Sequence, residues 1–157
     1  MSDKPAKTLA EIAAEIGPQT RRKASADALD RKRAKEEETQ AMLPKVQQAY
    51  KSAVAKAVAV LCPHEINLVE YPAKPFAPNV FAQKLEITRP WSTAKFGTLN
   101  TDITSTGSVS VVFAVRVEKR HAKEALAYDI AQMDEDQWTE VITKFVDLYS
   151  RILRRSL

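Results

Sequence analysis

Hydrophobic residues recur at helical spacing towards the C-terminal end of the chain. Between 135 and 155 they form one wide apolar face, which comprises Trp138, Val141, Ile142, Phe145, Leu148, Tyr149 and Ile152. Asp134 stands just before this segment, and Gln137 follows at the third helical position, a pattern typical of a helix N-terminus. The sequence therefore predicts an amphipathic C-terminal helix over 135–155.

A second amphipathic pattern lies upstream, over 45–61. Its apolar residues share one helical face, namely Val46, Tyr50, Ala53, Val54, Ala57 and Leu61. Pro44 either kinks a preceding helix or opens this one in its first turn, where a missing N–H does no harm. Cys62 comes before Pro63 and ends the segment, because a residue that precedes proline disfavours the helical conformation. We expect a helix here that packs on a sheet.

The middle of the chain shows the alternation of β-strands. Strand patterns cover four segments, 66–71, 83–89, 99–104 and 109–118. Gly107 lies in the turn between the last two, which therefore form a hairpin. Residues 124–133 fit either a strand or a helix; the alternation of Leu126, Tyr128 and Ile130 favours a strand that completes an antiparallel meander. We predict an α+β fold, with an antiparallel sheet of four or five strands covered on one face by both long helices.

The chain begins with a short amphipathic segment, which we predict to be a helix over 8–16. Thr8 and Glu11 have the spacing of a capping box, and Gly17–Pro18 is expected to end the helix. Its single apolar face consists of Leu9, Ile12, Ala13 and Ile16. A helix of two turns is not stable by itself in water. The segment therefore docks on its own domain, docks on a partner, or is disordered.

Residues 19–42 have the pattern of a polar helix. Leu29 and Met42 are its only larger apolar residues, so it has no hydrophobic core of its own. We therefore expect a basic helical arm over 1–43, followed by a compact domain over 44–157.

The net charge of the chain is confined to its first part. Up to Leu61 there are 12 basic and 8 acidic residues, whereas the rest of the chain has 12 of each. A basic run in the arm is suited to neutralising phosphates, and alternating aromatic and basic residues in a predicted loop at 89–96 are suited to stacking on bases. The residues concerned are Arg21, Arg22, Lys23, Arg31, Lys32, Arg33, Lys35, Arg89, Trp91, Lys95 and Phe96. The alternatives are a solvated helix face, and a loop whose two aromatic residues close the end of the core.

Motifs for catalysis or for metal binding are not found. The three glycines lie far apart, which excludes the glycine-rich phosphate loops. Cys62, His64 and Glu65 are adjacent, but Leu68 stands where a zinc helix of the His-Glu-x-x-His type needs its second histidine. Asp134, Glu135 and Asp136 are better explained as the start of the last helix. We therefore expect a protein that is not an enzyme and needs neither a metal nor a cofactor.

The N-terminus, the hydropathy of the chain, its cysteine count and the arm indicate a location and a function. The N-terminus is charged and lacks an apolar leader, no stretch is apolar enough to span a membrane, and one cysteine excludes an internal disulfide, so a cytoplasmic protein is expected. The leading hypothesis is an assembly protein whose arm docks through Leu9, Ile12, Ala13 and Ile16 on a protein partner, or on other copies in an oligomer. The alternative is a nucleic-acid-binding protein that uses the basic arm and the 89–96 segment.

Overall fold

The computed structural model describes residues 8–89 and 92–155, with the side chains of 15–23 and 92–95 left out of the description. The chain divides into two compact units, Met1–Lys35 and Glu36–Leu157. Each unit is described by itself below.

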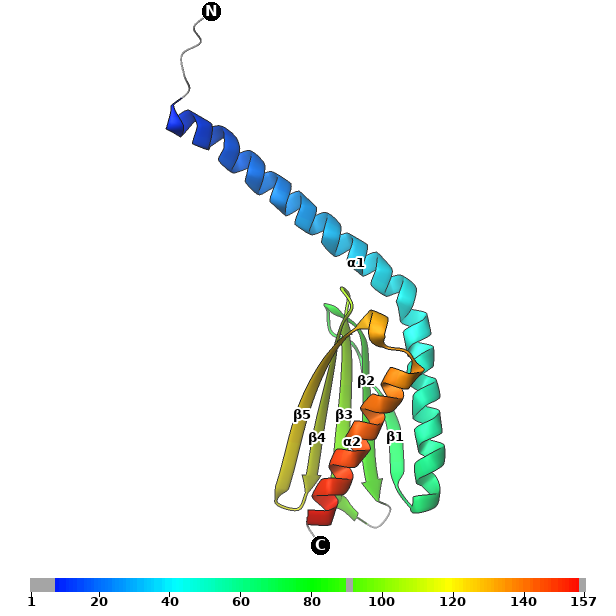
Figure 1. The fold of residues 1–157 in the computed structure, drawn as a ribbon. Helices are drawn as coiled ribbons and strands as arrows, with labels where there is room; N and C mark the ends of the chain where they lie inside the picture. Colours follow the sequence, from blue (N-terminus) through cyan, green and yellow to red (C-terminus); the bar gives the residue numbers. More distant parts are fainter. Residues whose placement is uncertain (1–7, 90–91, 156–157) are drawn as a thin grey trace, which may run out of the picture. The chain divides into compact units, whose positions relative to one another are not determined.

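The fold is α+β, as the sequence predicts. Two α-helices, α1 (Leu9–Leu61) and α2 (Glu135–Arg155), accompany a single sheet (Figure 1). Its strands are β1 (Asn67–Pro72), β2 (Asn79–Arg89), β3 (Ser92–Thr104), β4 (Ser108–Val117) and β5 (Arg120–Asp129). Short 3-10 helices, η1 (Cys62–His64) and η2 (Ile130–Gln132), follow α1 and β5.

The first helix is longer than the sequence predicts. Gly17–Pro18 was expected to end one helix, and Pro44 to mark the boundary of another, yet α1 continues through both. A proline inside a helix removes one backbone hydrogen bond and clashes with the preceding turn, but it does not prevent helix on either side. The alanines and the long charged side chains around Pro18 favour helix, and the residues after Pro44 are held by packing. The predicted helices 8–16, 19–42 and 45–61 are therefore parts of one helix.

The sheet is an antiparallel meander with the strand order β1-β2-β3-β4-β5. The strand interpretation of 124–133 is confirmed up to Asp129, the last residue of β5, and η2 begins at Ile130. The strand β3 corrects another prediction, because it begins at Ser92 and includes most of the segment expected to be a loop at 89–96. Its pairing with β2 and β4 supplies hydrogen bonds to backbone groups that a loop would leave to water.

The core of the Glu36–Leu157 unit lies between one sheet face and the two helices (Figure 1). Leu85, Leu99 and Phe113 stand opposite one another on three neighbouring strands and are all fully buried. From α2 the predicted apolar face is buried: Trp138, Val141, Ile142, Phe145, Leu148, Tyr149 and Ile152. Alternate residues point to the opposite sheet face, where Asn100 and Ser110 are exposed. Both long helices thus cover the same face, as expected.

The packed part of α1 begins before Pro44. Thr39 is only 1% exposed. It lies beside Gly107, the glycine of the predicted hairpin turn, which has a φ of +90°. A Cβ at Gly107 would come within 2.9 Å of both Thr39 Oγ1 and Ile130 Cγ2. A larger residue there would therefore clash with these atoms, and it would also be forced into an unfavourable backbone conformation. Residues of the segment 1–43 that the sequence assigns to the arm therefore already belong to the packing of the compact unit.

Both helix starts follow the predicted chemistry. The backbone N–H of Gln137 donates to Asp134 Oδ1 at 2.8 Å, and the backbone N–H of Glu11 donates to Thr8 Oγ1 at 3.3 Å. Each side chain thus satisfies an N–H group that has no partner within its own helix. The Thr8 bond shows that α1 begins where the sequence indicates, even though it does not end at Gly17.

Candidate functional site

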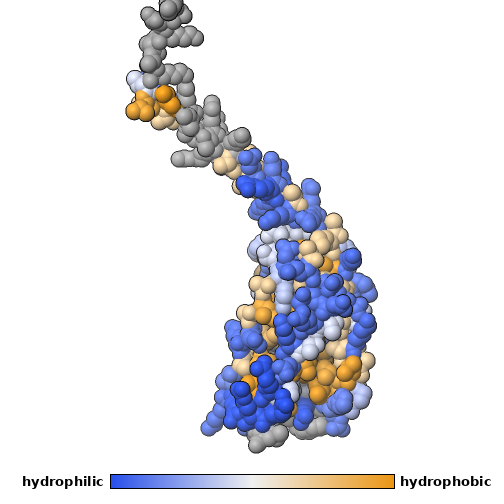
Figure 2. Space-filling model, in the orientation of Figure 1, coloured by the Kyte–Doolittle hydropathy of each residue, from blue (hydrophilic) through white to orange (hydrophobic). Residues whose placement is uncertain are grey.

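The predicted docking residues lie in the first turns of α1. Leu9 is 86% exposed and Ile12 is 39% exposed, and Ala13 is exposed as well. These residues are three or four positions apart, so they share one face of the helix. The side chain of Ile16 lies outside the described residues. Figure 2 shows hydrophobic residues gathered at this end of the helix.

The basic residues of the arm follow along α1. Arg31, Lys32, Arg33 and Lys35 are all exposed. Arg31 Nε donates to the main-chain carbonyl oxygen of Asp27 at 3.3 Å, so part of its hydrogen-bonding capacity is used within the helix. The side chains of Arg21, Arg22 and Lys23 lie outside the described residues.

The second candidate segment, 89–96, is mostly part of the sheet. Arg89 ends β2 and pairs in register with Ser92, while Trp91 and the side chain of Lys95 lie outside the described residues. Phe96 is half-buried. Its neighbour Gly97 faces Phe145 of α2, because a Cβ on Gly97 would lie 3.1 Å from that ring. Side chains alternate along a strand, so Phe96 points to the opposite face of the sheet.

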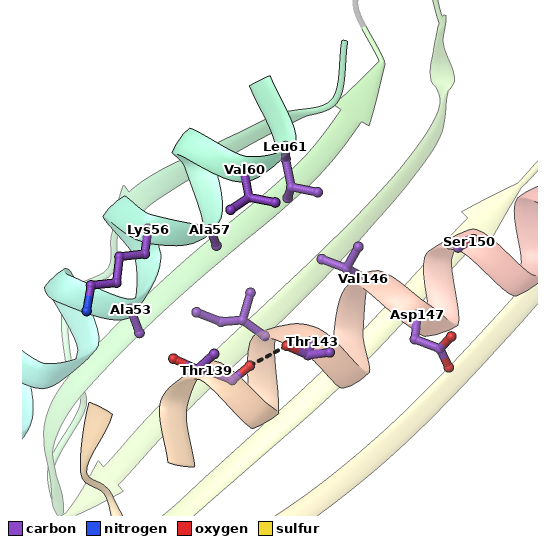
Figure 3. A pocket seen from close by; sticks show the side chains of 11 residues that line it. Ala53, Lys56, Ala57, Val60, Leu61, Thr139, Thr143, Val146, Asp147 and Ser150 are labelled. Atoms are coloured by element: carbon purple, nitrogen blue, oxygen red, sulfur yellow. Dashed lines mark hydrogen bonds between the residues drawn. The ribbon is translucent and has the colours of Figure 1, made fainter. Parts of the chain in front are cut away.

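A groove between α1 and α2 is the feature that the sequence did not reveal. Its volume is about 480 Å³. From α1 it is lined by Ala53, Lys56, Ala57, Val60 and Leu61, and from α2 by Thr139, Ile142, Thr143, Val146, Asp147 and Ser150 (Figure 3). We call this surface the helix groove. The small side chains of Ala53 and Ala57 leave space between the helices, and Val60, which is 66% exposed, adds an apolar rim.

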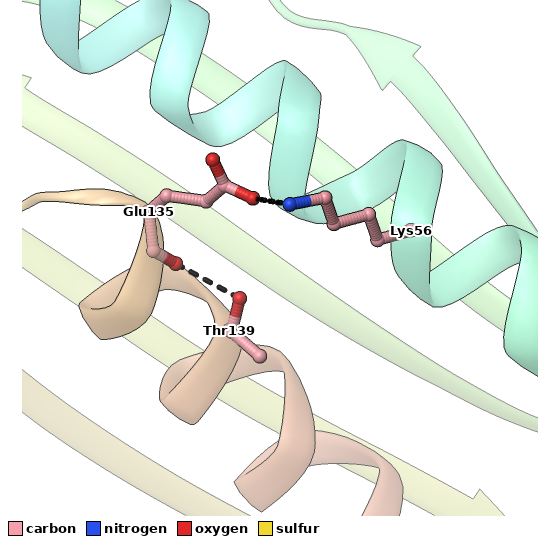
Figure 4. A network of polar contacts seen from close by, with 3 residues as sticks. All are labelled: Lys56, Glu135 and Thr139. Atoms are coloured by element: carbon pink, nitrogen blue, oxygen red, sulfur yellow. Dashed lines mark hydrogen bonds and ion pairs between the residues drawn. The ribbon is translucent and has the colours of Figure 1, made fainter.

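An ion pair joins the two helices at the helix groove. Lys56 Nζ donates to Glu135 Oε1, and this hydrogen bond raises the pKa of Lys56 and lowers the pKa of Glu135 (Figure 4). The side chain of Lys56 remains 71% exposed and that of Glu135 37% exposed. Glu135 also lines a second hollow of about 300 Å³, between Met42, Val46 and Met133. The pair thus joins a residue that lines the helix groove to one that lines the second hollow.

Polar atoms are enclosed in the core beneath the helices. Tyr50 Oη, Gln83 Oε1, Thr101 Oγ1 and Trp138 Nε1 are buried, and none has a hydrogen-bond partner among the described residues. Gln83 and Thr101 are paired across β2 and β3. Burial, with a smaller contribution from the Glu70 carboxylate, raises the pKa of the Tyr50 hydroxyl far above its ordinary value of 10.0. The phenol is therefore neutral at physiological pH.

Within the part of the chain that the structure describes, three or more His, Cys, Asp or Glu side chains nowhere gather as they would around a metal ion. Cys62 is a free thiol and is exposed at the end of α1. None of the described helices is both long and apolar enough to cross a membrane. Comparison of the chain with protein-family models, with curated proteins and with solved structures gives no match.

Proposed function

We propose that this protein is a non-enzymatic assembly component whose N-terminal helical segment docks on neighbouring subunits. The observation that carries the proposal is the exposure of Leu9 and Ile12, 86% and 39%, on one face of the first turns of α1. Single exposed apolar residues are ordinary on protein surfaces. Two large ones on the same helical face, ahead of the mostly polar stretch of α1, are better explained as a contact surface.

The energetics of the segment support the same interpretation. Exposed helical turns without tertiary contacts are marginal in water, because most helical stability in proteins comes from packing an apolar face. Burying a leucine or an isoleucine side chain contributes about 1.5–3 kcal/mol. Docking of Leu9 and Ile12 on an apolar surface therefore stabilises both the helix and the assembly, which makes a short amphipathic helix an effective ligand for a groove.

Sedimentation velocity over a range of concentrations tests the proposal. The native chain is expected to self-associate, and Leu9→Asp with Ile12→Asp is expected to abolish the association, because two carboxylates cannot be buried in an apolar contact without a large desolvation cost. Leu29→Asp is the matched control, since Leu29 is 48% exposed on the same helix. A chain that stays monomeric at every concentration, or association that survives the double substitution, contradicts the proposal.

A second candidate function, nucleic-acid binding, is favoured by the exposed basic residues of the arm. The unit Met1–Lys35 has nine basic and five acidic residues, a net charge of +4, whereas Glu36–Leu157 is neutral, with 15 of each. Arg31, Arg33 and Lys35 are exposed along one helix, and such charges bind phosphates without reading sequence.

Salt dependence tests this second function. Replacing Arg21, Arg22, Lys23, Arg31, Lys32 and Arg33 by Gln removes six cations. If the arm binds nucleic acid, each lost phosphate contact lowers the slope of log affinity against log salt by roughly 0.7–0.9. Binding of unrelated sequences should weaken equally. An unchanged slope would exclude the arm from nucleic-acid contact, and loss of a single sequence would indicate base readout instead.

A further inference from the structure

We propose that the compact unit binds single-stranded nucleic acid at one end of its sheet, through a cluster of cations and an adjacent row of side chains on which bases stack. The inference goes beyond the proposed assembly function, because it gives the Glu36–Leu157 unit a ligand of its own. Of the residues that the sequence indicates for nucleic-acid binding, only Phe96 is included.

Six exposed cations gather at one end of the unit. Four of them lie in or beside the turn between β4 and β5, and two are the last residues of α2: Arg116, Lys119, Arg120, Lys123, Arg154 and Arg155. The helix α2 finishes at the same end of the sheet as this turn (Figure 1), and Figure 2 shows strongly hydrophilic side chains gathered there. We call these six residues the basic end.

The basic end has a net positive charge that is not used within the fold. None of its six side chains forms an ion pair with another described residue, whereas Lys144 and Arg151 on α2 are each paired with a carboxylate. Between 116 and 123, Glu118 is the only acidic residue beside four cations. The compact unit as a whole is neutral, so its positive charge is concentrated at this end, and such a surface attracts an anionic ligand.

A row of side chains suited to stacking lies beside the basic end. Phe96 pairs in register with Arg116, and Arg116 pairs with His121. Val115 and Val117 are buried, so Arg116 points to the sheet face that the helices leave uncovered, which we call the open face. Residues that pair directly across strands share a face and have Cβ atoms about 5 Å apart. A phenyl ring, a guanidinium plane and an imidazole therefore stand side by side on the open face.

This combination of groups favours a single strand over a duplex. Phosphates bind to the cations of either, but unpaired bases can also stack on aromatic rings and on guanidinium planes, whereas the bases of a duplex are already stacked on one another. The next pair on the open face, Thr98 with Ala114, is small, so a base on the row meets no bulky neighbour. Arg116 belongs to both the row and the basic end, which places the stacking groups next to the phosphate contacts.

An anionic membrane is a less suitable partner for the basic end. Proteins that lie on a membrane surface bury apolar side chains beside their cations. Among the described residues, the large hydrophobic side chains that are exposed belong to α1, to β1 and to the loop after β1, and none belongs to β4, β5 or α2. The basic end therefore has the charge for such a surface but lacks the apolar anchor.

Fluorescence anisotropy with a labelled oligothymidylate of about 16 nucleotides, the length of a large single-strand site, tests the inference. The full-length native chain is expected to bind it, with an affinity that falls as salt is added. Lys119→Gln with Arg120→Gln and Lys123→Gln should weaken binding. It should also lower the slope of log affinity against log salt by roughly 0.7 for each lost phosphate contact, about 2 in all.

The matched control removes the same charge elsewhere on the compact unit. Lys45, Lys51 and Lys74 are exposed in α1 and in the loop between β1 and β2, and their replacement by Gln should leave the slope unchanged. Equal effects of the two triple variants, or no binding by the native chain, would overturn the inference. If only the Gln variant of the arm loses binding, the second candidate function stands and this inference is overturned.

Stacking is tested by Phe96→Leu, which keeps an apolar side chain but removes the aromatic face. Affinity for the oligothymidylate should fall roughly fivefold or more, while the salt slope stays unchanged because no cation is lost. Thermal unfolding of the variant verifies that it is folded. Phe76→Leu is the control, since Phe76 is 83% exposed in the loop between β1 and β2, at the opposite end of the meander from the turn between β4 and β5.

Competition identifies the class of ligand. An unlabelled single strand should displace the oligothymidylate more effectively than a duplex of the same length at the same salt concentration. A preference for the duplex, or an unchanged affinity in folded Phe96→Leu, would overturn single-strand binding on the row. Binding to phosphatidylserine vesicles without binding to the oligonucleotide would identify an anionic membrane as the partner and would overturn the inference as well.

Discussion

The ring of Tyr50 meets the ring of Trp138 edge to face, with centroids 5.0 Å apart and planes at 80°. Tyr50 also contacts Phe81 in the same geometry, at 5.7 Å and 81°. Tyr50 belongs to α1, Trp138 to α2 and Phe81 to β2, so three elements are joined at one aromatic cluster. Edge-to-face pairs add about 0.5–1.5 kcal/mol beyond the burial of area. The cluster therefore fixes the spacing of the two helices that form the helix groove.

Trp138→Ala should largely unfold the compact unit. The side chain is fully buried, and truncation of a core tryptophan costs about 3–5 kcal/mol, which is comparable with the whole stability of many domains. Denaturant unfolding, followed by circular dichroism, measures the loss. Tyr71→Ala is the comparison, because Tyr71 is an aromatic residue that is 43% exposed. This substitution should lower the free energy of unfolding by about 1 kcal/mol. A larger loss for Tyr71 than for Trp138 would contradict the core described here.

Tyr50→Phe should leave the unit folded and change how its free energy of unfolding depends on pH above about pH 10. The Tyr50 hydroxyl is buried without a hydrogen-bond partner among the described residues, so its removal should be neutral or slightly stabilising. Burial raises the pKa of this phenol above 10.0, so the unfolded chain loses the proton first. The contribution of protonated Tyr50 to the free energy of unfolding is therefore fully present below about pH 10 and is lost as the pH rises above that value. In the Tyr50→Phe variant this loss of stability at alkaline pH should be smaller. Denaturant unfolding of both proteins between pH 8 and pH 11 checks the prediction.

Removal of Met1–Lys35 should leave a folded unit. The deleted residues belong to the separate N-terminal unit, and the core begins at Thr39. Thermal unfolding should remain cooperative, with a small shift of the midpoint. Removal of Met1–Leu43 should shift the midpoint much further, since it also deletes Thr39 and the partly buried Met42 and Leu43. Equal midpoints for the two truncations would show that the packing around Thr39 contributes little.

The elements with a strong local signal were predictable from the sequence. The helix α2 has both a wide apolar face and an N-terminal cap at Asp134, so its bounds agree with the prediction. The strand β4 alternates from Val109 to Val117, and the residues at alternate positions are buried. In both elements the local preference and the burial favour the same structure, which is the condition under which a pattern is informative.

The errors arose where long-range packing decides the structure. The local pattern predicts the helix after Pro44 and its buried face with Val46 and Tyr50, but it does not show that this helix continues through the proline from the preceding one. Strand pairing also makes Ser92–Phe96 the start of β3 where a loop was expected: Ser92 pairs with β2, Lys95 with β4, and Phe96 with both. The helix groove depends on the spacing of two helices that are far apart in sequence, so Ala53 and Ala57 were recognised as core residues but not as the lining of a groove.

The most direct test of the central claim is amide hydrogen–deuterium exchange along α1 at several protein concentrations. If the start of the helix docks on another copy, protection of residues 9–16 should rise with concentration, while protection of residues 24–35, which are exposed throughout, should stay constant and low. In the Leu9→Asp, Ile12→Asp variant the concentration dependence should disappear. Protection of residues 9–16 that is the same at every concentration would contradict the claim that this segment is an assembly contact.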